Sequence, residues 1–225
     1  MKVGILLPAY NEEKNIKLVI EECKKYFKGS EIVVINDGST DKTEKIAKKT
    51  KVTVISHTKN LGKGEALKTG LKYFSKRPVN FILIADADRQ YSIKDLKKLL
   101  NSLSNVDFVM GYRNFSRIPF RHRFGNLVWR STFNFLFGTN FKDTNCGLMG
   151  LSKKIIKKIR IGKGYTAESY ILASIVKNKI KFTQVPVNVK YKKISSIGRG
   201  VKTVFTVLAF IIKEGIKFRL KLTNE

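Results

Sequence analysis

The first half of the chain alternates between short apolar runs and longer amphipathic stretches. The apolar runs fall at residues 3–7, 31–36, 52–56 and 81–85. Between the first two runs, the apolar residues of the stretch 16–23 recur at the spacing of one helix face. Strands that alternate with helices pair in parallel and bury both faces of their sheet. The pattern therefore predicts an α/β fold with a mainly parallel central sheet flanked by helices.

The second half of the chain contains a segment of different composition. A predicted helix over residues 93–104 and an apolar run at 106–114 lead into a basic and aromatic stretch at 115–138. The pattern then predicts a short strand at 143–152, a helix at 166–178, an alternating strand at 181–191 and an amphipathic helix at 201–222. We expect one folded domain over residues 1–200 and a C-terminal amphipathic helix within 201–225.

Charge and cysteine content narrow the setting. The chain has 45 basic against 17 acidic residues, a formal net charge of +28. This excess favours nucleic acid, anionic lipid or a phosphorylated ligand as partner, although habitat or codon usage also produces lysine-rich chains. The longest apolar run, 204–212, is far below the roughly 20 residues of a membrane span. Cys23 and Cys146 are far apart and no signal peptide is recognisable, so we expect buried free thiols in the cytosol.

Polar clusters follow three of the predicted strands, at residues 8–12, 36–41 and 86–88. Parallel sheets bind ligands beyond the carboxyl ends of their strands, so these clusters are expected at one site. In an extended chain Asp86, Asp88 and Gln90 point the same way, and their oxygens suit Mg²⁺ or Mn²⁺ held jointly with a substrate diphosphate. The same Asp-x-Asp spacing also occurs in solvated loops.

Two further features concern nucleotide binding. Asp37 ends the second apolar run, where it can accept hydrogen bonds from a base or ribose. Segment 59–70 carries glycines at a helix start, where backbone N–H groups and the helix dipole favour an anion. It matches neither the dinucleotide fingerprint nor the P-loop, which argues against NAD and ATP.

His57 and His122 lack the partners of a zinc site, so we expect them to be structural or merely basic.

Six motifs, in order along the chain, carry a family resemblance. They are LLPAYNE, VVINDGSTDKT, NLGKGEA, LIADADRQY, MGYRN and DTNCGLMGLS, which span about residues 3–152. Together they resemble family 2 glycosyltransferases, most closely the dolichyl-phosphate mannose synthase type and its polyprenyl-phosphate relatives. The resemblance implies a GT-A fold, a nucleotide-sugar donor and a divalent metal. It divides the domain into a nucleotide-sugar-binding half, 1–112, and an acceptor-binding half, 113–200.

The resemblance also implies roles for individual residues. The donor would be bound by Pro8, Ala9, Tyr10, Glu12, Asp37, Gly62, Lys63, Asp86 and Lys202. The metal would be held by Asp86, Asp88 and Gln90. The catalytic residues would be Asp88, Arg113 and Arg199. The sugar would be transferred with inversion at its anomeric carbon, and Arg113 and the metal would stabilise the diphosphate that leaves. Arg89 departs from the apolar residue that is usual at its position.

The acceptor can be distinguished by its need for a base. A lipid monophosphate has a second pKa of about 6, so it is mostly a dianion at neutral pH and needs only cations to position it. The candidates for these cations are the arginines Arg117, Arg121, Arg123 and Arg130. A hydroxyl acceptor would instead need a carboxylate base, for which Asp143 and Glu168 are the candidates.

Two segments are candidates for membrane contact. The stretch 115–138 interleaves arginines with seven aromatic residues, as interfacial surfaces do, but a core helix with a basic outer face would show the same pattern. The final helix can lie on a membrane through Val204, Phe205, Leu208 and Ile212, or pack on the domain or on a second subunit.

These observations favour a metal-dependent inverting glycosyltransferase. We expect it to move a hexose, with mannose from GDP-mannose as first choice, onto dolichyl or polyprenyl phosphate at the cytoplasmic face of a membrane. UDP-glucose or UDP-N-acetylglucosamine as donor is the nearest alternative, followed by a soluble family 2 transferase with a hydroxyl acceptor. A nucleic-acid-binding module would explain the net charge but leaves the acidic strand ends unexplained.

Overall fold

The computed structural model describes residues 2–114, 120–162, 164–190 and 198–222. Its centre is a seven-stranded sheet with the order β3-β2-β1-β4-β6-β5-β7. The strands are β1 (Val3–Ala9), β2 (Glu31–Asn36), β3 (Thr53–Ser56), β4 (Phe81–Ile84), β5 (Phe108–Arg113), β6 (Met149–Ser152) and β7 (Phe182–Val187). All pairs are parallel except the two made by β6, which runs antiparallel between β4 and β5. The predicted α/β fold with a mainly parallel sheet is confirmed.

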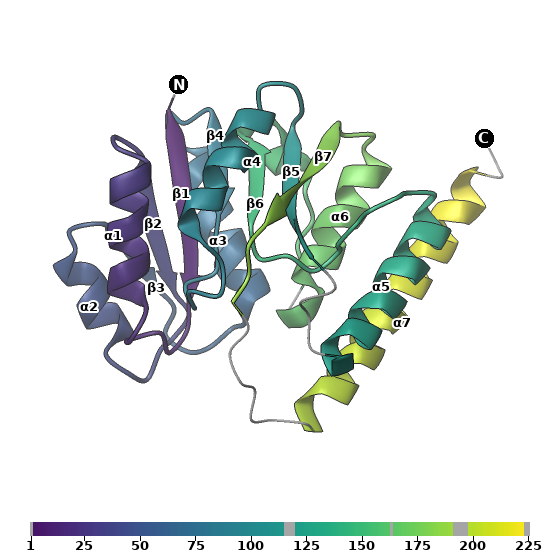
Figure 1. Cartoon of the computed structure of the whole chain (residues 1–225), viewed down its shortest axis with the longest axis horizontal. Coiled ribbons are helices and arrows are strands. Elements are labelled where there is room, and N and C mark those ends of the chain that lie inside the picture. Colours follow the sequence, from purple (N-terminus) through teal and green to yellow (C-terminus); the bar gives the residue numbers. More distant parts are fainter. Residues whose placement is uncertain (1, 115–119, 163, 191–197, 223–225) are drawn as a thin grey trace.

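Helices cover both faces of this sheet (Figure 1). The α-helices are α1 (Ile16–Tyr26), α2 (Thr43–Lys49), α3 (Lys63–Ser75), α4 (Leu96–Ser102), α5 (Phe120–Phe137), α6 (Ala167–Lys177) and α7 (Gly198–Leu222). Short 3-10 turns lie at η1 (Ile93–Asp95), η3 (Lys153–Lys158) and η4 (Gly164–Thr166). The predicted helix over 93–104 is therefore a 3-10 turn followed by α4.

The register of the parallel strands brings their carboxyl ends to one edge of the sheet. Ala9 at the end of β1 lies beside Asn36 at the end of β2, and Asn36 lies beside Ser56 at the end of β3. On the other side of β1, Leu6 pairs with Ile84, the last residue of β4. The loops that follow β1, β2 and β4 must therefore start close to one another.

Helix α3 approaches β1 so closely that only glycine fits at the contact. A Cβ on Gly70 would lie 2.1 Å from Cδ1 of Leu6, and a Cβ on Gly4 would lie 2.4 Å from the ring of Phe74. Leu6 and Phe74 are both fully buried. The close contact fixes the height of α3 on the sheet, and with it the position of the loop before α3.

Helices α5 and α7 lie side by side at the end of the molecule remote from α1 and α2 (Figure 1). Gly215 of α7 has no room for a side chain, because a Cβ there would lie 2.5 Å from Cβ of Leu136. Arg219 donates to the carbonyls of Phe135 and Leu136 at the C-terminal end of α5, where a cation also suits the helix dipole. The final helix thus packs on the domain through one face.

The aromatic stretch divides between core and surface. Phe133 and Phe137 are buried and stacked at a centroid distance of 4.3 Å, so the expectation of an interfacial surface is wrong for these two. Phe135 on the other side of α5 is 78% exposed. Cys23 and Cys146 are buried free thiols, as predicted. Within the described residues, no helix combines the length and apolar character needed to span a bilayer.

Replacement of Gly70 tests the close contact between α3 and β1. We expect Gly70→Val to lower the free energy of unfolding by about 1–3 kcal/mol, because the added methyl groups collide with the buried Leu6 side chain. Lys72→Val places the same residue on the exposed side of α3 and should change stability by less than about 0.5 kcal/mol. Urea denaturation measures both. Equal stability of the two variants would contradict the proposed contact.

Candidate functional site

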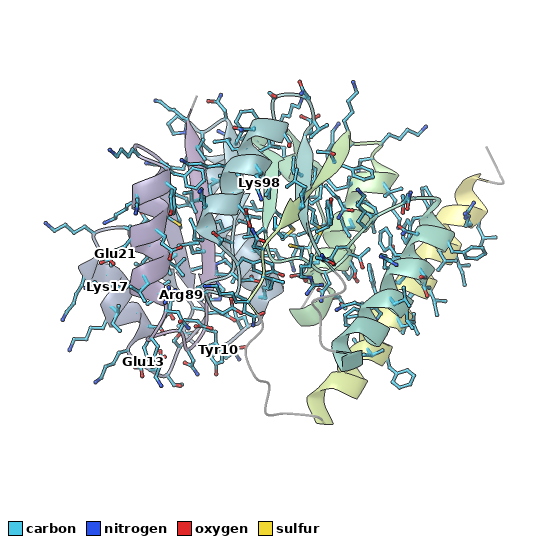
Figure 2. All side chains as sticks on the ribbon, viewed as in Figure 1. Tyr10, Glu13, Lys17, Glu21, Arg89 and Lys98 are labelled. Carbon is cyan, nitrogen blue, oxygen red and sulfur yellow. The ribbon has the colours of Figure 1, made fainter. Side chains whose placement is uncertain are left out.

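The loops after β1 and β2 are bound to each other. Asn11, in the left-handed region at φ 55°, accepts a hydrogen bond from the backbone N–H of Thr40 at 2.9 Å. Thr43 Oγ1 accepts from the N–H of Glu12 at 2.7 Å, and Asp41 accepts from the N–H of Glu13 at 3.0 Å. These bonds hold the segment around Tyr10 and Glu12 at the carboxyl edge of the sheet. Tyr10 and Glu13 lie toward the same end of the molecule in Figure 2.

Asp37 organises the loop that leads into α3. Its carboxylate accepts hydrogen bonds from the N–H groups of Leu61 and Gly62 at 3.0 and 2.8 Å. His57 Nδ1 lies 2.7 Å from the same carboxylate, and His57 Nε2 lies 2.9 Å from Thr69 Oγ1. Asp37 lines the cleft, but most of its hydrogen-bonding capacity is used inside the protein. Its predicted contact with base or ribose stays a prediction.

The Asp-x-Asp segment adopts a turn. Strand β4 ends at Ile84, and Arg89 takes a left-handed backbone conformation at φ 59°, so the expected extended chain is wrong here. Asp88 Oδ1 accepts the N–H of Gln90 at 2.9 Å, which closes the turn. Asp86, Asp88 and Gln90 nevertheless all line one cleft, because the turn brings them round to the same side. Arg89 is exposed and lies 3.7 Å from Glu22 of α1, outside the residues that line the cleft.

Lys63 joins two carboxylates from different elements. Its ammonium nitrogen lies 2.6 Å from Oδ1 of Asp86 and 2.8 Å from Oε1 of Glu168. Burial acts against the charge of Lys63, but Asp86 and Glu168 outweigh it and raise the pKa of the ammonium group. Lys63 is therefore a cation at neutral pH, held at the first residue of α3 by the turn after β4 and by the start of α6.

Gly147 makes room for Asp86. A Cβ at position 147 would lie 1.9 Å from Oδ2 of Asp86, so any side chain there would expel the carboxylate. The N–H of Gly147 donates to the hydroxyl of Tyr91 at 3.2 Å, which fixes the approach of this segment. The motif DTNCGLMGLS therefore shapes the cleft through a glycine.

Arg113 and Asp143 form a buried pair with two parallel hydrogen bonds. Arg113 Nε lies 2.7 Å from Oδ2 of Asp143, and Nη2 lies 3.0 Å from Oδ1. The backbone N–H groups of Arg113 and Asn145 donate to the same carboxylate. Asp143 is 1% exposed and does not line the cleft, so its geometry speaks against the predicted role as a general base.

These groups surround one cleft of about 810 Å³. Its lining includes most of the predicted donor and metal residues that the structure describes: Pro8, Ala9, Tyr10, Glu12, Asp37, Gly62, Lys63, Asp86, Asp88 and Gln90. Arg113 and Glu168 line it as well. A hollow of about 900 Å³ lies at the opposite edge of the sheet, but its carboxylate, Asp107, is paired with Lys154 at 2.8 Å. The cleft is therefore the candidate active site.

A smaller pocket of about 510 Å³ adjoins the cleft and shares Arg113 with it. Arg130, a predicted acceptor-phosphate residue, lines this pocket with Lys98, Lys142 and Tyr112. Arg117 lies outside the described residues. The backbones of Arg121, Arg123, Arg199 and Lys202 lie in α5 and α7, but their side chains are not among those described. Their predicted roles are neither supported nor opposed by the structure.

Sequence reasoning missed several residues of the cleft. Trp129 of α5 lines it and donates its indole N–H to the carbonyl of Val204 at 3.1 Å, which ties the cleft wall to α7. Asn60, Asn145 and Gly164 also line it. Asn145 belongs to one of the six motifs and could have been proposed, whereas Trp129 reaches the cleft only through the packing of α5.

The cleft suits a divalent cation that shares its ligands with a substrate. Among the described residues, no three His, Cys, Asp or Glu side chains gather where they could hold a metal ion by themselves. Asp86 and Asp88 do offer hard carboxylate oxygens in the cleft. Mg²⁺ is commonly bound through one or two carboxylates together with substrate phosphates. The residues fit such an ion when a diphosphate supplies the remaining ligands.

The family profile described as glycosyl transferase family 2 matches residues 4–160. This chain belongs to that family. The UDP-N-acetylglucosamine--dolichyl-phosphate N-acetylglucosaminyltransferase of Methanococcus voltae is 30% identical over 230 residues, 90% of this chain and 90% of that protein. The polyprenol monophosphomannose synthase of Mycolicibacterium smegmatis is 23% identical over 232 residues, 96% of this chain and 88% of that protein.

The fold is shared with a set of solved structures. Glucosyl-3-phosphoglycerate synthase from Mycobacterium tuberculosis, in complex with Mn²⁺, UDP and phosphoglyceric acid, superposes with a TM-score of 0.79 at 20% identity. The match covers 95% of this chain and 78% of that chain. The GT-A fold and the resemblance to the polyprenyl-phosphate type of family 2 glycosyltransferase are therefore confirmed.

Removal of Asp143 separates a structural role from a catalytic one. We expect Asp143→Ala to destabilise the protein by about 3–5 kcal/mol, because it leaves the buried Arg113 guanidinium without its counter-charge. Lys154→Ala breaks a pair between the exposed Lys154 and the partly buried Asp107, and should cost no more than about 1 kcal/mol. Thermal and urea unfolding measure both. Native stability of Asp143→Ala would contradict the structural role.

Proposed function

We propose that this glycosyltransferase moves a hexose from a nucleoside diphosphate sugar to dolichyl or another polyprenyl phosphate, with inversion and with Mg²⁺ or Mn²⁺ in the cleft. The observation that carries the proposal is the joint position of Asp86, Asp88 and Gln90 in one cleft. Of the two candidate bases, Glu168 lines this cleft but is paired with Lys63, and Asp143 lies outside the lining and is paired with Arg113. Residues 1–112 would bind the donor and residues 113–200 the acceptor.

The state of the candidate bases supports a phosphate acceptor. Glu168 is buried and paired with the Lys63 ammonium at 2.8 Å, and Asp143 is held by Arg113. Each carboxylate is already bound to a cation of the protein, and it would have to give up that contact to serve an acceptor hydroxyl. A hydroxyl acceptor needs such a base, whereas a phosphate dianion attacks without one. The pocket lined by Lys98, Arg113, Arg130 and Lys142 offers positive charge for that dianion.

The reaction then needs only orientation and charge stabilisation. An oxygen of the acceptor phosphate attacks the anomeric carbon, and the bond from that carbon to the diphosphate breaks with its electron pair on the diphosphate oxygen. A divalent cation at Asp86 and Asp88 would stabilise this charge when bound. Arg113 lines both cavities and has Nε and Nη2 fixed on Asp143, so Nη1 is the edge best placed to reach a phosphate.

The relatives support an order among the candidate donors. The motifs alone suggest GDP-mannose. The Methanococcus voltae relative, named for UDP-N-acetylglucosamine, is more similar over comparable coverage than the mannose synthase. We therefore place UDP-N-acetylglucosamine first and GDP-mannose second. A nucleic-acid-binding module would leave the acidic cleft without a role.

A transfer assay tests this function. The protein is incubated with labelled UDP-N-acetylglucosamine, GDP-mannose or UDP-glucose, polyprenyl phosphate and Mn²⁺, and the lipid is extracted. We expect label in the organic phase from one donor, loss of product with EDTA, and a fall on the order of 10²-fold or more in Asp88→Asn. Asp107→Asn, far from the cleft, should keep full activity. Transfer to a hydroxyl acceptor but not to lipid phosphate would overturn the proposal.

The surface of α7 supports contact with a membrane. Phe205, Ile212, Ile216 and Leu220 form an exposed apolar stripe along this helix, and Phe135 is exposed on neighbouring α5. The exposed cations Lys213 and Lys217 lie on α7 as well. Apolar residues flanked by cations bind anionic interfaces, and each cation near such a surface contributes about 1 kcal/mol. We propose peripheral binding to the cytoplasmic face, where the lipid acceptor is reached.

Vesicle binding tests this surface. We expect the protein to sediment with vesicles that contain anionic lipid, and Phe205→Ser together with Ile216→Ser to weaken binding by about tenfold or more, because two apolar side chains no longer enter the interface. Leu18→Ser removes a comparably exposed leucine from α1 and should have no effect. Protein that stays in solution with every vesicle, or an equal effect of Leu18→Ser, would contradict membrane docking by α7.

A further inference from the structure

Lys63 occupies an unusual position for a cation. It is the first residue of α3, where the helix dipole disfavours positive charge. Its side chain is 29% exposed, and its nitrogen touches one carboxylate that would bind a metal, Asp86, and one that would not, Glu168. Glu168 is 7% exposed on its side chain and comes from α6 rather than from the turn after β4. The arrangement places a resident cation directly on a metal ligand.

A divalent ion and the Lys63 ammonium cannot both bind Asp86 at full strength. Two cations on one carboxylate repel each other, and the repulsion is larger in a partly buried cleft than in water. Glu168 offers the ammonium a second anion that can hold it when Asp86 turns to a metal. A diphosphate entering the cleft would add negative charge that both cations can share.

We propose that Lys63 is a counter-ion that keeps divalent cations off Asp86 until the donor diphosphate arrives, and that Glu168 is the positioning residue that holds Lys63 when it yields. This inference rests on the proposed donor and metal site. Metal and nucleotide then bind cooperatively. The diphosphate offsets the repulsion between the metal and the Lys63 ammonium, and the metal offsets the repulsion between the diphosphate and the carboxylates. The enzyme without donor therefore binds metal weakly, because no diphosphate supplies the remaining metal ligands.

Mn²⁺ binding in the absence of donor tests the inference directly. Free Mn²⁺ is measured by electron paramagnetic resonance, first with protein alone and then with added UDP. We expect Lys63→Met to raise donor-free Mn²⁺ affinity about tenfold and to reduce the gain that UDP brings. Glu168→Gln should lower donor-free affinity several-fold, since Lys63 then has only Asp86 as partner. Lys68→Met, which removes a cation paired with Glu65 on the same helix, should leave both values unchanged.

A second variant keeps the inference testable if Lys63→Met folds poorly. Should Lys63→Met fold poorly, the double variant Lys63→Met with Glu168→Gln removes the cation and one carboxylate together, and it should still bind donor-free Mn²⁺ more tightly than the wild type. Unchanged or weaker donor-free affinity in the Lys63 variants, or tighter affinity in Glu168→Gln, would overturn the inference. If the wild type binds no Mn²⁺ even with UDP or GDP present, the proposed metal site itself is wrong, and this inference falls with it.

Discussion

Parallel pairing of β1 with β2 and β4 is the constraint from which the geometry of the site follows. It forces three loops to begin at one edge of the sheet, whatever their sequences. The close seat of α3 on β1, which Gly70 permits, then sets the start of α3 beside the turn after β4. Lys63 reaches Asp86 because of that placement. The chemistry of the cleft follows from backbone hydrogen bonds and one tight helix contact.

Cations or N–H groups of the protein already bind carboxylates in the lining of the cleft and directly behind it. Asp37 takes the loop N–H groups, Asp143 takes Arg113, and Glu168 takes Lys63. Asp88 bonds within its own turn. The chain has a net charge of +28, and the pocket that adjoins the cleft is lined by Lys98, Arg113, Arg130 and Lys142. Anionic substrates and an anionic membrane surface both suit such a molecule.

The sequence was sufficient to predict the elements that depend on local pattern. The apolar runs became β1, β2, β3 and β4, and the residues that share a face between 16 and 23 became the buried side of α1. Asp86, Asp88 and Gln90 were proposed because they follow a buried strand directly, and all three line the cleft. The predicted extended conformation of this segment was wrong, since nothing in the local sequence required Arg89 to adopt a left-handed turn.

Contacts between distant segments could not be predicted from local pattern. The Lys63–Glu168 and Arg113–Asp143 pairs depend on how α3, α6 and β5 pack. Asp143 was a candidate base because a hydroxyl acceptor would need a carboxylate, and nothing in the sequence indicated that the Arg113 guanidinium binds both of its oxygens.

The central claim is that Asp86 and Asp88 hold the metal ion, and locating bound manganese tests it directly. Crystals grown with Mn²⁺ and UDP, measured at the manganese absorption edge, reveal the ion by its anomalous scattering. We expect one peak in the cleft at about 2.0–2.3 Å from an oxygen of Asp86 or Asp88 and from the diphosphate, with Lys63 shifted toward Glu168. Nucleotide bound in the cleft without such a peak, or manganese held by other residues, would show that these carboxylates do not form the metal site.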